Sequence, residues 1–294
     1  MTKACTNFPG DRILQGFTAH VIASDDVELV VVPALGAKII SLKNLRTGRE
    51  WLWHPKDELK LFRNHPRDDF SASPLTGIDE CLPTISPCEW RGRELPDHGE
   101  VWNQPWQVDE TDLQNGVITT SIKLKTSPLM FKRTLELRGN EVKFDYQLTN
   151  LSDLDEHFIW AIHPLLRLQT GDVLAMPGST RELLKGAAWM ETVGSAVPEK
   201  GCAKVFACAV SEGWVAIENQ AQGDRLKFAW NPGEMNTLGL WLTRGGWHGH
   251  HHFAIEPTNG NHDSLVVAAG GKHCGRIPAR GALEGSLSLH IGKT

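Results

Sequence analysis

Three short motifs place an imidazole or a carboxylate beside a rigid neighbour: Pro96-Asp97-His98-Gly99, Ile162-His163-Pro164 and Ile255-Glu256-Pro257. Proline restricts the residue before it to extended backbone, so His163 and Glu256 are expected at strand ends rather than in helices. Two imidazoles and a carboxylate that face one another across a cleft supply a proton donor and a proton acceptor. The sequence therefore predicts an acid–base site.

A run rich in histidine, Trp247-His248-Gly249-His250-His251-His252, precedes the glutamate motif. If 253–256 is a strand, alternation of side chains places His252 on the face of Glu256 and turns His251 away. We therefore expect His252 to line the site. Imidazoles with Glu256 or Asp263 are also ligands for a divalent metal, which remains the alternative for this segment, although consecutive strand residues diverge.

The elements that must position these groups have the pattern of a β protein. Short alternating or β-branched runs recur along the chain, separated by turn signals such as Asn115-Gly116 and Arg138-Gly139-Asn140, and a helical period is seen only at 181–189. The expected strands are 17–23, 27–32, 38–42, 117–124, 129–137, 142–148, 157–162, 205–210, 214–217, 226–230, 238–243, 253–256, 265–268 and 287–291. Such a series without βαβ alternation predicts an all-β fold, a large antiparallel β-sandwich, in one domain over 1–294.

One long tract, 54–100, lacks strand signals and is rich in Pro, Asp, Arg and Gly. Long loops on a rigid sheet scaffold often carry binding groups, so half of the site is expected there.

Composition restricts the partners. The net charge of −5 from 30 basic and 35 acidic residues gives no positive field for nucleic acid or an anionic membrane. No apolar run has the length of a membrane span, and 1–20 does not resemble a signal peptide, so a soluble cytoplasmic protein is expected. The six cysteines contain no C-x-x-C pair, which is typical of reduced and mostly buried thiols.

Tryptophan is unusually frequent, with 11 Trp against 1 Tyr. Indole faces pack against the C–H faces of sugars, although most are expected to fill the core. The candidates are Trp51, Trp53, Trp90, Trp102, Trp106, Trp160, Trp189, Trp214, Trp230, Trp241 and Trp247.

Several motifs together resemble the aldose 1-epimerase (galactose mutarotase-like) superfamily. The opening Val32-Pro33-Ala34-Leu35-Gly36-Ala37 is followed by Glu50-Trp51-Leu52-Trp53 and by Gly77-Ile78-Asp79-Glu80-Cys81-Leu82-Pro83. The His98 motif, the segment from Leu148 to His163-Pro164, and Phe253-Ala254-Ile255-Glu256-Pro257 then follow in the family's order. The resemblance implies a large antiparallel β-sandwich.

The resemblance also implies a reaction, the interconversion of the α and β anomers of an aldose. A base takes the proton of the C1 hydroxyl while an acid protonates the ring oxygen, the ring opens, and reclosure reverses both transfers without a metal or organic cofactor. By the resemblance, Glu256 is the base, His163 the principal acid and His98 its helper. A neighbouring carboxylate is expected to hold the histidine protonated.

The chain departs from its relatives where the substrate is bound. Mutarotases carry an Asn-Arg pair before the first histidine and hexose-phosphate epimerases an arginine after it, whereas this chain has Asp79-Glu80 and Trp102. Carboxylates accept hydrogen bonds from hydroxyls and repel phosphate, which favours a free monosaccharide. The expected substrate-binding residues are Asp79, Glu80, Trp102, Trp241 and His252.

Two other functions remain open at this stage. A sugar-phosphate epimerase would use an arginine of the long tract, from Arg63, Arg67, Arg91 and Arg93. A carbohydrate-binding domain would keep the sandwich without turnover.

Overall fold

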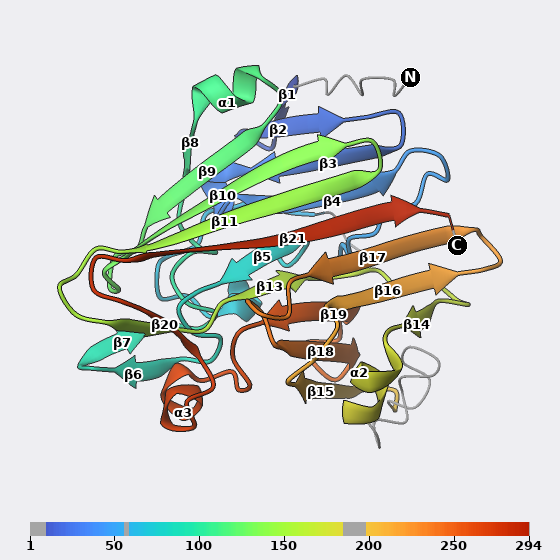
Figure 1. Ribbon diagram of the computed structural model, residues 1–294. Helices are drawn as coiled ribbons and strands as arrows, with labels where there is room; N and C mark the ends of the chain where they lie inside the picture. The colour runs from blue at the N-terminus through green and yellow to red at the C-terminus, as the bar shows by residue number, and fades with distance from the viewer. Residues whose placement is uncertain (1–9, 56–58, 185–197, 294) are drawn as a thin grey trace.

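The computed structural model describes residues 10–55, 59–184 and 198–293. In these residues two large antiparallel sheets lie face to face (Figure 1). The nine-stranded sheet has, in spatial order, β1 (Gly10–Leu14), β2 (Phe17–Ala23), β3 (Val27–Val32), β4 (Lys38–Asn44), β5 (Ile78–Cys81), β13 (Ala161–Pro164), β19 (His251–Thr258), β18 (Thr237–Arg244) and β15 (Gly201–Cys208). The eight-stranded sheet has β14 (Val173–Ala175), β16 (Trp214–Asn219), β17 (Asp224–Trp230), β21 (Ala282–Gly292), β11 (Glu141–Asn150), β10 (Leu129–Arg138), β9 (Ile118–Lys123) and β8 (Gln107–Val108).

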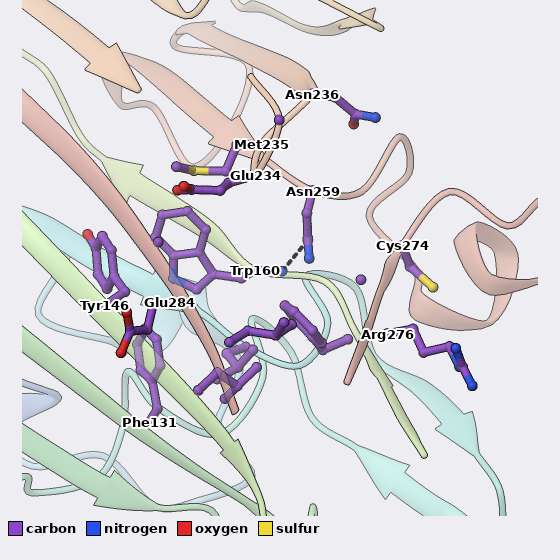
Figure 2. Close-up of a pocket in the computed structure, with 17 residues that line it drawn as sticks. Phe131, Tyr146, Trp160, Glu234, Met235, Asn236, Asn259, Cys274, Arg276 and Glu284 are labelled. Atoms are coloured by element: carbon purple, nitrogen blue, oxygen red, sulfur yellow. Dashed lines mark hydrogen bonds between the residues drawn. The ribbon is translucent and has the colours of Figure 1, made fainter. Parts of the chain in front are cut away.

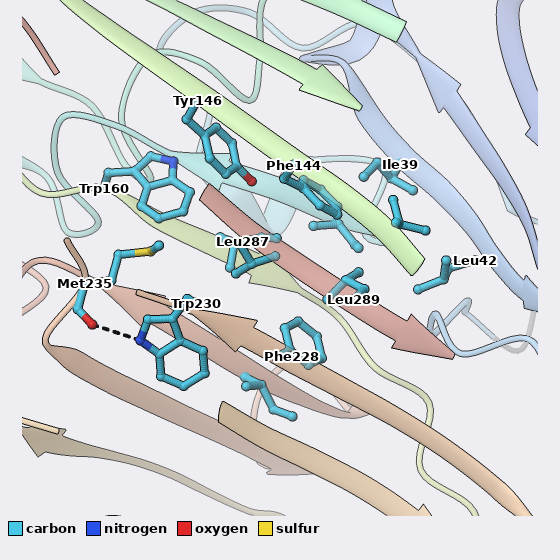
Figure 3. Packing of buried hydrophobic residues seen from close by; sticks show 14 of the residues in the cluster. Ile39, Leu42, Phe144, Tyr146, Trp160, Phe228, Trp230, Met235, Leu287 and Leu289 are labelled. Carbon is cyan, nitrogen blue, oxygen red and sulfur yellow. Dashed lines mark hydrogen bonds between the residues drawn. The ribbon is translucent and has the colours of Figure 1, made fainter. Parts of the chain in front are cut away.

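The main core fills the space between the two sheets. Figure 3 shows Ile39 and Leu42 of β4 together with Phe144 of β11, Phe228 of β17 and Leu287 of β21 in one cluster. Along each strand, alternate side chains point into this core, for example Ile162 on β13 and Ile255 on β19. The residues between them point to the opposite face, which carries the candidate site. The predicted antiparallel β-sandwich is therefore confirmed.

Smaller elements cover the ends of the sandwich. The hairpin of β6 (Cys88–Trp90) and β7 (Arg93–Leu95) forms one two-stranded sheet, and β12 (Glu156–Phe158) pairs with β20 (Gly275–Ile277), from a distant part of the chain, in another. The helices of the described residues are short: α1 (Glu110–Gln114), α2 (Gly178–Leu183), α3 (Leu265–Gly270) and the 3₁₀ turns η1 (Pro33–Leu35) and η2 (Phe70–Ala72). None of these helices has the length and apolar character needed to cross a bilayer.

The strand predicted at 265–268 is wrong, because this segment is helix α3. Leu265 and Ala268 are buried while Val266 and Val267 are exposed, which is the spacing of a helical face. A four-residue apolar run does not distinguish the two periods. The strand predicted at 157–162 is divided between β12 and β13, which belong to different sheets.

The tract 54–100 is not a plain loop. It contains η2, the hairpin β6–β7 and the central strand β5, which lies between β4 and β13. The helix predicted at 181–189 overlaps the end of α2, and its part beyond 184 lies outside the described residues, as does Trp189. Of the described cysteines only Cys81 is buried, so the expectation of mostly buried thiols is wrong for this part of the chain.

Candidate active site

Strand register places several polar side chains on one face of the nine-stranded sheet. His163 on β13 is the cross-strand partner of Asp79 on β5. Glu256 on β19 faces Gly239 on β18, and Trp241 on β18 faces Lys204 on β15. Cross-strand partners point to the same side, so these side chains lie on the face opposite the core.

A cavity of about 150 Å³ opens on this face. It brings together five of the residues predicted from the sequence: His98, His163, Trp241, His252 and Glu256. The rest of the lining comprises Phe70, Ile85, Ser86, Asp97, Leu165, Lys204, Trp247 and Asp263. The acid–base groups are buried, with Glu256 0% and His163 7% exposed.

Glu256 is a fully buried carboxylate in the lining of this cavity. Its Oε1 is 3.7 Å from Nε2 of His163, and its Oε2 is 2.9 Å from Nζ of Lys204. Neither oxygen has a hydrogen-bond partner of good geometry among the described residues. A Cβ atom on Gly239 would lie 3.2 Å from Oε2, so a glycine at this position leaves room for the carboxylate. Glu256 is therefore a buried carboxylate with free acceptor capacity.

Lys204 holds two carboxylates at once. Its Nζ is 2.7 Å from Oδ1 of Asp263 as well as 2.9 Å from Glu256. Burial acts against the ammonium charge, but the two carboxylates outweigh it and raise the pKa of Lys204. Lys204 is therefore a permanent cation next to Glu256.

His98 is held in a defined orientation. Its Nδ1 lies 2.9 Å from Oδ1 of Asp97, and its ring stacks on Phe70 at 4.1 Å between centroids. Its φ of 55° lies in the left-handed region, and the next residue, Gly99, has φ 75°. A Cβ atom on Gly99 would collide with the carbonyl oxygen of Leu82, so only glycine fits there. Strained backbone of this kind is typical of functional sites.

Asp97 connects the loop of Phe70 to His98. Its Oδ2 accepts a hydrogen bond of 2.9 Å from the Phe70 amide. Partial burial opposes the charge of Asp97, but the hydrogen bond and charge of His98, together with backbone amides, lower the pKa of this carboxyl. An ionised Asp97 fixes the ring so that Nε2 of His98 is left for a ligand.

His163 faces both His98 and Glu256. The two imidazole centroids are 5.1 Å apart and nearly perpendicular. Burial, with further contributions from the positive charges of His98 and Lys204, lowers the pKa of His163 well below its usual value. His163 is thus neutral at neutral pH, and the expectation that a carboxylate holds it protonated is not met in this geometry.

His252 forms part of the wall above Glu256. It is 2% exposed, and both of its ring nitrogens lack a hydrogen-bond partner among the described residues. Burial lowers the pKa of His252 to about 3, and His250 and His251 add to the effect. A neutral imidazole with two unused nitrogens can donate to a sugar hydroxyl and accept from another.

Three predicted substrate-binding residues do not line this cavity. Asp79 shares the face of His163 but forms a fully buried ion pair with Lys38, and burial raises its pKa. Trp102 donates from Nε1 to the backbone oxygen of Asp97 and packs on Phe70, so it supports the His98 loop from behind.

Glu80 follows Asp79 on β5 and points to the opposite face, into the core. Its Oε1 accepts from Arg133 and from Tyr146, each at 3.0 Å, and its Oε2 accepts from Trp160 at 2.9 Å. A second cavity of about 380 Å³ begins beside this network, between the ends of the sheets. In Figure 2, Phe131, Tyr146 and Trp160 border it on one side and Cys274 and Arg276 on the other. Of the residues predicted to contact a ligand, the tryptophan candidate Trp160 lines it, whereas His98, His163 and Glu256 do not.

The arginines of the long tract are engaged elsewhere. Arg91 donates to the backbone oxygen of Asp155, Arg93 pairs with Glu156, and Arg67 pairs with Glu94 at the surface. Arg63 lines a separate small cavity. In the described part of the chain, no group of three or more His, Cys, Asp or Glu side chains is arranged to hold a metal ion.

Sequence reasoning missed Lys204 and Phe70, and it named Trp247 only among the tryptophans. Lys204 is a lone cation in the interior of β15, next to the partly buried Val205 and Phe206. A charged residue inside an otherwise apolar strand can indicate that one face of the strand borders a polar site. Phe70 gives no such signal, because its place depends on the Asp97 contact.

The antiparallel sandwich, with a cavity on the outer face of its nine-stranded sheet, has a galactose mutarotase-like fold. A galactose mutarotase-like protein from Clostridium acetobutylicum matches 98% of this chain and 99% of its own, with a TM-score of 0.71 and 14% identity. A galactose mutarotase related enzyme from Lactobacillus acidophilus matches 94% and 98%, with a TM-score of 0.67 and 14% identity. The Slr1438 protein from Synechocystis sp. PCC 6803 matches 100% and 99%, with a TM-score of 0.71 and 14% identity.

The sequence comparison identifies the family. A sequence model of the aldose 1-epimerase family matches residues 19–185, more than half of the chain. The chain therefore belongs to the aldose 1-epimerase family. A search of curated protein sequences gave no significant match.

Proposed function

We propose that the protein is an aldose 1-epimerase that interconverts the α and β anomers of a free, hydroxyl-rich aldose. The observation that carries this proposal is the buried Glu256 carboxylate, with both oxygens short of hydrogen bonds, 3.7 Å from an imidazole nitrogen in one cavity. A carboxylate and an imidazole at this separation can act on two oxygens bound to the same carbon. Those oxygens in an aldopyranose are the C1 hydroxyl and the ring oxygen.

Glu256 is the base of the proposed reaction. It takes the proton of the C1 hydroxyl as the bond between C1 and the ring oxygen breaks and C1 becomes an aldehyde. Lys204 is a positioning residue, because its charge lies 2.9 Å from Oε2 of the buried Glu256 and attracts that carboxylate without a direct role for its own proton. After rotation about the C1–C2 bond, the ring oxygen attacks the other face of the aldehyde and gives its proton back to the acid, while Glu256 returns its proton to the C1 oxygen.

The two histidines divide the task at the ring oxygen. Neutral His163 donates a hydrogen bond, as neutral imidazoles do in other proton-transfer sites. His98, whose Nδ1 is fixed by Asp97, supplies the proton through Nε2, since Asp97 balances the charge of its imidazolium form. In this assignment His98 is the acid and His163 the polariser, the reverse of the roles that the family resemblance implies.

The charges in the cavity favour an uncharged sugar. Lys204 is balanced by Glu256 and Asp263, while Arg91, Arg93 and Arg67 of the tract 54–100 bind other groups and Arg63 lines a separate cavity. A phosphate would meet Asp97, Asp263 and Glu256 without a free cation among the described lining residues. These contacts support a free aldose over a sugar phosphate.

Exchange spectroscopy by NMR tests this function. The protein is added to equilibrated glucose, galactose, mannose and xylose, and the magnetisation transfer between α and β C1 protons is measured against buffer. We expect exchange with at least one aldose to rise at least 100-fold above the spontaneous rate, and Glu256→Gln to abolish the increase. Spontaneous rates with every sugar would contradict the proposal.

A further inference from the structure

The cavity beside the Glu80 network lies apart from the candidate active site. Its volume is about 380 Å³, and it opens between the ends of the two sheets (Figure 2). That volume falls within the range of roughly 300–1,000 Å³ that is usual for small-molecule sites. The two cavities share no lining residue in the described part of the chain, so a ligand here would not depend on the Glu256 chemistry. We call this space the end cavity.

Aromatic rings form the inner wall of the end cavity. Phe131 and Tyr146 stack at 5.7 Å between ring centroids, and Tyr146 meets Trp160 at 4.7 Å. The phenol oxygen of Tyr146 and the indole nitrogen of Trp160 both donate to Glu80, so these polar atoms are already paired. The surface left for a ligand is apolar, and Met235 adds to it. The inner wall therefore suits an aromatic group.

A glycine on β21 keeps the end cavity open. Gly285 is the cross-strand partner of Tyr146, whose side chain is buried between the sheets. Cross-strand partners point to the same side of a sheet, so a side chain at position 285 would enter the cavity. Apart from its chain neighbours, a Cβ atom there would meet only the carboxylate of Glu234 within 4 Å, with Oε2 at 3.2 Å. The open space at Gly285 is thus bordered by a charged group.

Glu234 is held at this place by neutral donors. Its Oε2 accepts from the Ser286 amide at 3.0 Å, and its Oε1 accepts from the side chain of Asn231 at 2.8 Å. Arg276 is the one cation in the described lining, and it is paired with Asp155 instead. The charge that stays unbalanced at the end cavity is therefore negative.

We propose that the end cavity binds a small aromatic amine, with its ring against the inner wall and its ammonium group at Glu234. An ammonium ion donates to the lone pairs that the two neutral donors leave free on this carboxylate. The ring faces of Tyr146 and Trp160 also favour a cation over an anion. An aromatic carboxylate would meet a like charge, and a neutral aromatic molecule would gain only the apolar contact. This proposal is independent of the proposed function.

Methionine methyl NMR tests the site and the ligand class together. Met235 lines the end cavity, whereas Met176 is buried elsewhere in the core. The protein, labelled at its methionine methyl groups, is titrated at low salt with tryptamine, tryptophol and indole-3-acetate, which share an indole ring and end in a cation, a neutral group and an anion. We expect the Met235 signal to shift and that of Met176 to stay. Tryptamine should bind with a Kd at least about threefold lower than tryptophol, and indole-3-acetate should bind most weakly.

Three variants separate the ring contact from the charge. Glu234→Gln should remove the preference for tryptamine over tryptophol. Glu284→Gln is the matched control, because Glu284 lies beside Gln147 on the outer face of the sheet, and it should keep the preference. Gly285→Leu should fill the end cavity and weaken tryptamine and tryptophol at least about tenfold. Leu283→Trp, at an exposed position of the lining, serves if Gly285→Leu does not fold.

Each result decides the proposal. An unchanged Met235 signal with every ligand, or a shift that survives the filled cavity, overturns the site. Equal binding of the three ligands, or a preference for tryptamine that survives Glu234→Gln, overturns the assignment to an amine. Anomer exchange by the same samples is a separate result, so tryptamine binding without any exchange supports the end cavity while the proposed function fails.

Discussion

Two buried carboxylates on opposite faces of the same sheet have very different surroundings. Glu80 faces the core, where Arg133, Tyr146 and Trp160 donate to its two oxygens. Glu256 faces the cavity, where Lys204 and His163 are close but neither of its oxygens has a well-formed hydrogen bond among the described residues. Both carboxylates are 0% exposed, so burial alone does not distinguish them.

The difference distinguishes a structural carboxylate from a reactive one. A buried carboxylate with three donors is part of the packing, and its loss leaves those donors unpaired. A buried carboxylate with a neighbouring cation and unused acceptor sites is ready to bind a ligand or take a proton. The outward face of the sheet is thus catalytic in our proposal and the inward face structural.

The largest expected effect is the contrast between substitutions of Glu256 and of Glu80, the first in kcat and the second in stability. Glu256→Ala should lower kcat for anomer exchange by about 10³-fold or more, since it removes the base. It should change the free energy of unfolding by less than about 2 kcal/mol, because Lys204 keeps Asp263 and no well-formed hydrogen bond is lost. Glu80→Ala should lower the free energy of unfolding by about 3–5 kcal/mol and leave kcat of the folded protein within tenfold. Urea unfolding and NMR exchange on both variants give the result, and similar effects on both would remove the distinction.

Substitution of either histidine should lower kcat less than substitution of Glu256, and the two histidines should differ from each other. His98→Gln should lower kcat about 10²–10³-fold, whereas His163→Gln, which keeps an N–H donor, should lower it about tenfold. Because the pKa of His163 lies well below its usual value, His163→Gln should leave the midpoints of the pH–rate profile unchanged. A larger loss for His163→Gln, or the disappearance of a limb of its profile, would restore His163 as the acid.

Replacing the cation next to the base should have an intermediate effect on rate and a clear effect on pH dependence. In Lys204→Met the buried carboxylate loses its counter-ion, so the acid limb of the pH–rate profile should move to higher pH and the rate at pH 6 should fall about tenfold. Lys227→Met, beside Trp214 on the other sheet, is the matched control. An unshifted acid limb would show that Lys204 acts only in packing.

The smallest expected effect concerns stability around Glu80. Burial, partly offset by Arg133, raises the pKa of Glu80 from 4.5 to about 7. The unfolded carboxyl ionises near 4.5, so between pH 4.5 and 7 the folded state holds the proton more tightly and loses stability as pH rises. Relative to Glu80→Gln, the wild type should lose about 2–3 kcal/mol of unfolding free energy over this range, measured by urea unfolding. If the unfolding free energy of the wild type instead rose relative to that of Glu80→Gln over this pH range, the charge of Arg133 would outweigh burial in setting the pKa of Glu80.

Sequence reasoning reached the fold and part of the site for identifiable reasons. Alternation along one strand predicted that His252 shares the face of Glu256, and both line the cavity. The same rule, applied to β5, places Asp79 and Glu80 on opposite faces, but the sequence of the tract 54–100 lacks the strand signals needed to predict β5. Phe70 and Lys204 depend on contacts with Asp97 and Asp263, which lie 27 and 59 residues away in sequence.

The most direct measurement compares the wild type with Glu256→Gln in NMR exchange of α and β anomers, with Glu80→Gln assayed beside them. We predict catalysed exchange for the wild type and for Glu80→Gln, and only the spontaneous rate for Glu256→Gln, with sugar binding retained in all three. Catalysed exchange that survives Glu256→Gln, or is lost to the same extent in Glu80→Gln, would contradict the assignment of the base to the cavity face of the sheet.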